Sequence, residues 1–194
     1  MSGAPASIRV LGIAGSLRAG SYNRALLRAA GALAPAGMEI VLFEGLREVP
    51  PYDADVDAAG EPAEVAALRQ AIGKADGLLF ATPEYNYSVP GVLKNAIDWA
   101  SRPVHRSVLQ RKAAGIVGAS AGASGTIRAQ LALRQSFVFT ETYAMLRPEF
   151  FLPRASERFD VSGELTDEPT REHLRQFLAA LDAWIRRFLT RPSA

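Results

Sequence analysis

The chain has 194 residues, a usual length for one domain, and its 48% hydrophobic and 22% charged content excludes a disordered protein. It has no cysteine and only two histidines, which excludes disulfides and a cysteine nucleophile, and no metal site is expected. The 22 basic residues against 20 acidic ones give a formal charge of +2 and are scattered, so no nucleic-acid partner is expected.

The N-terminus carries no recognisable targeting signal. Residues 1–7 have neither the positive segment nor the apolar stretch of a secretory signal. No apolar run reaches the ~20 residues that cross a bilayer. We therefore expect a cytoplasmic protein without a membrane partner. We expect one domain over residues 1–194, with flexible ends at 1–6 and 191–194.

Apolar runs and helical patterns alternate along the chain. The first apolar run covers residues 8–14 and is ended by Gly15, and alanines and leucines recur at helical spacing over 23–34. Further strands are expected over 39–43, 77–81, 113–118 and 143–152. Further helices are expected over 61–74, 92–100, 126–139 and 171–189. Residues 50–60 are expected to form a turn-rich loop.

This alternation predicts an α/β fold. Apolar strands separated by helices form a parallel sheet with helices on both faces, which is a three-layer sandwich. Five strands favour the flavodoxin-like order 2-1-3-4-5 over the six-stranded dinucleotide-binding fold. Ligands of such sheets bind beyond the carboxyl ends of the strands. The loops expected to bind a ligand are therefore 15–22, 82–91 and 119–125.

The first of these loops suits a phosphate group. It leads from a strand into a helix, whose first N–H groups attract anions. The hydroxyls of Ser16 and Ser21 and the amide of Asn23 can donate to phosphate oxygens, and Arg18 adds a charged donor. These groups favour a terminal monophosphate. The alternative is that Ser21 or Asn23 is an ordinary helix N-cap.

Two other kinds of phosphate site are less consistent with this loop. A P-loop needs Gly-Lys-Ser/Thr, which is absent. The dinucleotide fingerprint needs G-x-G-x-x-G, and the glycines here do not have that spacing. Glu44, after the second strand, is nevertheless in the position of a ribose-binding acid, which leaves that reading open.

The second loop, over residues 82–91, suits a flat aromatic ligand. Pro83 and Pro90 stiffen the backbone, and Tyr85 and Tyr87 can form a wall. Free N–H groups of such a loop can bind the polar edge of a heterocycle. The alternative is a structural turn whose tyrosines cover the end of the sheet.

Three segments together resemble a known family. They are GSLRAGSYNRAL at 15–26, TPEYNYSVPGVLKNAIDWASRP at 82–103 and VGASAGASGTIRAQLALRQ at 117–135. These segments are similar to the signatures of the NAD(P)H-dependent FMN reductases, and nearest to the bacterial quinone and chromate reductases. The resemblance covers roughly residues 8–150.

The resemblance implies a set of cofactor contacts. The residues expected to hold the FMN phosphate are Ser16, Arg18, Ser21 and Asn23, with Tyr22 beside it. Those expected at the isoalloxazine ring and ribityl chain are Pro83, Glu84, Tyr85, Asn86 and Tyr87. Ser120, Gly122 and Gly125 would close the site. This chain has Thr126 after Gly125 where the family commonly has paired glycines, and that side chain is expected to narrow the approach.

The resemblance also implies an activity. NADPH or NADH would pass a hydride to bound FMN, and a small acceptor would then take two electrons at the same face, by ping-pong exchange. Quinones, free flavin, azo compounds and chromate-type oxyanions fit as acceptors. No side chain is required as a catalytic nucleophile. A homodimer or homotetramer is implied as well.

Two residues have open roles in this scheme. Glu84 can be read as a general acid, but more readily as a residue that orders its loop or meets a partner subunit. Arg102 belongs to a basic stretch that could attract the 2′-phosphate of NADPH as a substrate contact, or simply be a solvated face.

Two other classes of protein remain as alternatives. One is a flavodoxin-type electron carrier that binds FMN without turning over a nicotinamide, although such carriers are usually strongly acidic. The other is an NADP-binding sensor without enzymatic activity.

Overall fold

The computed structural model describes residues 6–189. The ends expected to be flexible, 1–6 and 191–194, lie outside the described residues except for Ala6. The carbonyl of Ala6 accepts a hydrogen bond of 2.7 Å from Arg186.

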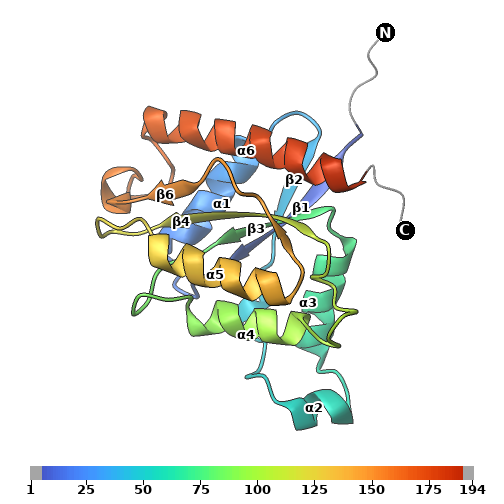
Figure 1. Cartoon of the computed structure of the whole chain (residues 1–194). Helices are drawn as coiled ribbons and strands as arrows, with labels where there is room; N and C mark the ends of the chain where they lie inside the picture. Colours follow the sequence, from blue (N-terminus) through green and yellow to red (C-terminus); the bar gives the residue numbers. More distant parts are fainter. Residues whose placement is uncertain (1–5, 190–194) are drawn as a thin grey trace.

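A parallel sheet forms the middle layer (Figure 1). Its path runs β2-β1-β3-β4-β5, and every pair of neighbouring strands is parallel. The strands are β1 (Ile8–Ala14), β2 (Met38–Leu42), β3 (Gly77–Ala81), β4 (Ala113–Ala119), β5 (Tyr143–Ala144) and β6 (Phe150–Leu152). The flavodoxin-like order 2-1-3-4-5 is therefore confirmed.

The edge of the sheet departs from the single strand expected over 143–152. β5 pairs with the start of β4, and β6 pairs with the last three residues of β4. The chain between them contains Pro148, which has no N–H to donate to the ladder. The edge strand is therefore interrupted, and β6 resumes pairing beside Ala119, next to the carboxyl end of the sheet.

Helices cover both faces of the sheet (Figure 1). α1 (Tyr22–Ala32) and α6 (Glu168–Leu189) pack on one face, and α3 (Ala63–Lys74), α4 (Gly91–Ala100) and α5 (Ile127–Phe139) on the other. Successive strand residues point to opposite faces, so Val10 joins the first core and Leu11 the second. The result is the expected three-layer sandwich.

The loop expected over 50–60 contains a short helix, α2 (Ala54–Ala59), which projects from the body below α3 in Figure 1. Asp53 caps it by accepting from the Asp55 N–H at 2.8 Å. Short 3₁₀ turns lie at Gly45–Arg47 and Ala155–Glu157. No helix within residues 6–189 combines the length and apolar character needed to cross a membrane.

Candidate functional site

A cavity of about 360 Å³ opens at the carboxyl ends of β1, β3 and β4. This is the edge where the strand directions predict a ligand. Its lining comes from the three expected loops and consists of Ser16, Arg18, Ser21, Tyr22, Asn23, Pro83, Glu84, Tyr85, Ala119, Ser120 and Ala121. The sequence predicted all of these except Ala119 and Ala121, whose small side chains carry no chemical signal.

Ser21 is the N-cap of α1. Its hydroxyl accepts from the N–H groups of Asn23, at 3.2 Å, and Arg24, at 3.4 Å. The ordinary N-cap reading is thus correct for Ser21. Because the hydroxyl acts as acceptor in both bonds, its own proton remains available to donate into the cavity.

Asn23 fastens α1 to the end of β4. Its amide nitrogen donates to the Ala119 carbonyl and its amide oxygen accepts from the Ala119 N–H, both at 2.9 Å. The residue is buried. Both ends of the amide are therefore committed to fixing the distance between two walls of the cavity. The expected direct donation from Asn23 to phosphate is at most a secondary use of this side chain.

The backbone of residues 16–20, of which Ser16 and Arg18 line the cavity, is the segment best suited to an anion. Within residues 6–189, none of its N–H groups is hydrogen-bonded to another protein atom. The Arg18 guanidinium folds over this loop, donates to the Gly20 carbonyl at 2.6 Å and lies 5.7 Å from the Tyr22 ring centre. Free N–H groups, a guanidinium and a helix N-terminus together form an anion-binding cradle.

The 82–91 loop contributes one tyrosine to the cavity, not two. Tyr85 and Ser88 exchange backbone hydrogen bonds of 3.2 and 3.0 Å around Asn86 and Tyr87, whose φ angles are 49° and 64°. Two successive positive φ angles are the geometry of a type I′ turn. The Tyr85 hydroxyl lies 3.4 Å from Ser16 Oγ. Asn86 and Tyr87 form the tip of this turn and do not line the cavity.

Glu84 faces α5. Its carboxylate accepts from the backbone N–H groups of Arg128 and Ala129 and from the Arg128 guanidinium. The side chain is 6% exposed. Of the roles considered, ordering its loop is the one that these contacts support.

The loop after β4 has a different construction from that expected. Ser120 lines the cavity. Its hydroxyl oxygen accepts a hydrogen bond from the Gly122 N–H at 3.1 Å. Gly125 has a φ of 58°, and a Cβ there would lie 3.1 Å from Phe151. Neither Gly122 nor Gly125 lines the cavity. They shape the loop and rest it on β6.

Thr126 does not narrow the cavity, contrary to expectation. It is fully buried, and its hydroxyl accepts from the Gln130 amide at 3.2 Å. It occupies the space that a Cβ on Gly118 would need, since such an atom would lie 1.9 Å from Thr126 Oγ1. The side chain points toward the sheet because Gly118 leaves a gap there.

Arg102 is not brought to this cavity. It follows the C-terminal end of α4, about 15 Å along a ten-residue helix from the strand ends. Its Nε donates to the Tyr52 hydroxyl at 3.1 Å. Lys112, from the same basic stretch, donates to the carbonyls of Gly73 and Ala75, and burial lowers the pKa of its ammonium group. Both side chains are thus held by contacts within the protein, which leaves the 2′-phosphate contact without support.

Glu44 also lies away from the cavity. It pairs with Arg24 at 2.5 Å and does not line the cavity, which removes support for a ribose-binding acid.

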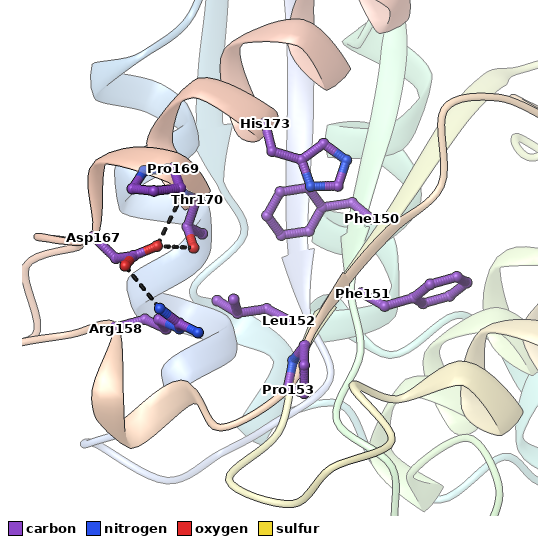
Figure 2. A pocket seen from close by; sticks show the side chains of 9 residues that line it. All are labelled: Phe150, Phe151, Leu152, Pro153, Arg158, Asp167, Pro169, Thr170 and His173. Atoms are coloured by element: carbon purple, nitrogen blue, oxygen red, sulfur yellow. Dashed lines mark hydrogen bonds and ion pairs between the residues drawn. The ribbon is translucent and has the colours of Figure 1, made fainter.

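A second cavity, of about 280 Å³, lies beside β6 and the start of α6 (Figure 2). Three of its polar side chains are joined through Asp167. Asp167 accepts from Thr170 and from Arg158, the latter at 2.8 Å. His173 also lines the cavity, and its ring centre lies 4.8 Å from that of Phe150. The remaining walls are mainly apolar, with Phe151, Leu152 and two prolines.

Comparison with known proteins decides the family. The family model for NADPH-dependent FMN reductase matches residues 8–157. The chain is a member of this family. An NAD(P)H-dependent FMN reductase of Pseudomonas aeruginosa is 52% identical over 180 residues, covering 93% of this chain and 96% of that protein. A 2-hydroxy-1,4-benzoquinone reductase of a Burkholderia species is 40% identical, covering 93% and 97%.

The solved structures agree with this assignment. FerB, a flavoenzyme NAD(P)H:(acceptor) oxidoreductase of Paracoccus denitrificans, superposes with a TM-score of 0.85 at 35% identity, covering 93% of this chain and 98% of FerB. The predicted resemblance, the oxidoreductase activity and the dependence on FMN and NAD(P)H are thereby confirmed for this NADPH-dependent FMN reductase.

Proposed function

We propose that the cavity at the strand ends holds the FMN of this reductase, with the phosphate on residues 16–22. The observation that carries the proposal is the run of unbonded N–H groups over 16–20, beneath the Arg18 guanidinium. An anion would satisfy donors that the protein leaves unpaired. The hydroxyls of Ser16 and Ser21 add two more donors in the same wall.

The rest of the cavity suits the ring and the ribityl chain. Pro83 and Tyr85 form a stiff wall, and the N–H group of Glu84, which also lines the cavity, is not bonded within the described residues. Ser120 and the two alanines beside it offer a surface without bulky side chains. Bound FMN would accept a hydride from NAD(P)H and pass two electrons to an acceptor. The protein would supply the orientation of the cofactor, through the walls of the cavity.

A quinone is the acceptor that we favour. Relatives of 40–42% identity are named as quinone reductases. Nicotinamide and quinone would bind in turn at the same opening, which is the ping-pong scheme. The same opening would also admit azo compounds, free flavin and chromate, which differ from a quinone in size. Family membership favours this enzyme over an electron carrier or an NADP-binding sensor.

Steady-state kinetics of the FMN-loaded protein test this scheme. Rates would be measured with NADPH and NADH against benzoquinone and chromate, with both substrates varied. Parallel double-reciprocal lines and competition between oxidised nicotinamide and quinone are expected. Intersecting lines would contradict exchange at one shared opening.

We also propose that the chain forms a homodimer or homotetramer through α5. Three apolar side chains follow one another at helical spacing on its outer side: Ile127, Leu131 and Val138, which is 81% exposed. A second copy of this chain is the occupant that would cover them. Val138→Asp should yield monomers in light scattering, whereas Val161→Asp, at an exposed site on another segment, should not.

A cytoplasmic location and a single folding domain stay predictions from the sequence. Fractionation of the producing cells tests the first. A single cooperative unfolding transition tests the second.

A further inference from the structure

Helix α5 begins without a cap of its own. Thr126, the residue before it, has a φ of 71° and makes no capping hydrogen bond with its side chain. That side chain is turned inward against Gly118. The first N–H groups of a helix have no partner within the helix, so another group has to satisfy them.

Glu84 supplies this cap from a different loop, 44 residues earlier in the chain. Its Oε2 accepts from the N–H of Arg128 at 3.0 Å and of Ala129 at 3.4 Å. A carboxylate at a helix N-terminus is also favoured by the helix dipole. The loop that carries Tyr85 is thus fastened to the first turn of α5.

Arg128 completes the attachment. Its Nε donates to Glu84 Oε1 at 2.6 Å, and its guanidinium carbon lies 3.8 Å from the centre of the Tyr87 ring. Arg128 therefore contacts both Glu84 and Tyr87 of the same loop, in which Asn86 and Tyr87 have left-handed backbone angles. Such a conformation is costly for a tyrosine and persists only where neighbouring contacts enforce it.

We propose that Glu84 and Arg128 are positioning residues of the flavin site with a second, electrostatic role. Glu84 holds the ring-contacting loop on α5, and Arg128 with the helix N-terminus cancels the charge that Glu84 brings into the cavity wall. FMN gains electrons when it is reduced, so an uncancelled charge in this wall changes its reduction potential. This proposal rests on FMN occupying the cavity.

The test is the sign of the potential shift in two variants. Glu84→Gln leaves Arg128 unpaired and should raise the midpoint potential of bound FMN. Arg128→Ala leaves the carboxylate unpaired and should lower it. A tenfold change in the relative affinity for reduced and oxidised FMN corresponds to about 30 mV for two electrons, and shifts of this order are expected. Simple loosening of the loop would move both potentials in the same direction.

Affinity and conservative variants complete the design. Both substitutions should weaken FMN binding about tenfold in a fluorescence titration. Arg128→Lys keeps the positive charge and should restore the potential, even where the affinity stays lower. Glu61→Gln breaks a comparable pair, Glu61 with Arg69 at 2.6 Å, far from the cavity, and should change neither quantity.

The outcomes distinguish a wrong role for Glu84 and Arg128 from a wrong location for FMN. If Arg18→Ala weakens FMN binding but the potentials of Glu84→Gln and Arg128→Ala stay unchanged or move together, the role of the pair is wrong and the cavity stands. If none of the three variants weakens FMN binding, both proposals are wrong. Should Glu84→Gln fail to fold, the contrast between Arg128→Ala and Arg128→Lys still tests the charge.

Discussion

The cavity at the strand ends and the cavity beside α6 are similar in size but differ in how their polar groups are used. At the first, the N–H groups of residues 16–20 are unbonded, and Ser16 and Arg18 among these residues line the cavity. In the second, Arg158 and Thr170 both bind Asp167, two lining residues are prolines without an N–H, and His173 lies outside this cluster. We infer that unsatisfied donors, and not volume, favour the first cavity as the site of a phosphorylated cofactor.

Among the variants that test this difference between the cavities, we expect the largest effect from a substitution of Asn23. Asn23→Ala removes two buried hydrogen bonds and leaves both polar groups of Ala119 without partners. The expected loss is about 2–4 kcal/mol of unfolding free energy, measured by urea denaturation, together with loss of FMN binding.

Asn95→Ala is the matched control for this variant. Asn95 makes the same two kinds of bond, accepting from the Tyr52 N–H at 2.7 Å and donating to the Pro50 carbonyl at 2.8 Å, away from the cavity. It should lower stability yet leave the FMN affinity of the folded protein intact. Equal losses of FMN binding in both variants would show that Asn23 acts only through global stability.

The two arginines test the comparison directly. Arg18→Ala removes a charged donor from the first cavity and should weaken FMN binding by about 1.5–3 kcal/mol. Arg158→Ala removes an arginine from the second cavity and should leave FMN affinity unchanged. Fluorescence titration of both purified variants provides the measurement, and an unchanged affinity in Arg18→Ala would end its assignment to the phosphate.

Asp167 should affect stability and not cofactor binding. The hydrogen bond from the Thr170 hydroxyl, with those from the Thr170 N–H and Arg158, lowers the pKa of Asp167 in the folded protein. A lowered pKa stabilises the fold above the unfolded-state value of about 3.9 and ceases to do so as the pH falls through the folded-state value. Asp167→Asn should therefore melt at a lower temperature than the parent at pH 7, and the gap should close below about pH 4.

The smallest expected effect is at Tyr85. Its hydroxyl lies 3.4 Å from Ser16 Oγ, which is a long hydrogen bond in a half-exposed position. Tyr85→Phe keeps the ring and should weaken FMN binding by no more than about 1 kcal/mol. A loss as large as that of Arg18→Ala would mean that the hydroxyl, and not the ring, is the important contact.

The location of the site follows from the sequence because strand direction alone sends three loops to one edge. The hydroxyls and the arginine of the first loop are also evident from the sequence, and Ser16, Arg18 and Ser21 do line the cavity. Long-range contacts do not follow: Asn23 meets Ala119 and Glu84 meets α5 only after the sheet has formed. The inward orientation of the Thr126 side chain could not be predicted from the sequence either, because it depends on the space left by the missing side chain of Gly118.

The bond between Asn23 and Ala119 spans 96 residues of chain. During synthesis, the loop that we propose to bind phosphate leaves the ribosome long before the strand that has to brace it. Cofactor loading must therefore wait until well over half of the polypeptide has emerged, so a truncated product that ends before β4 should remain colourless.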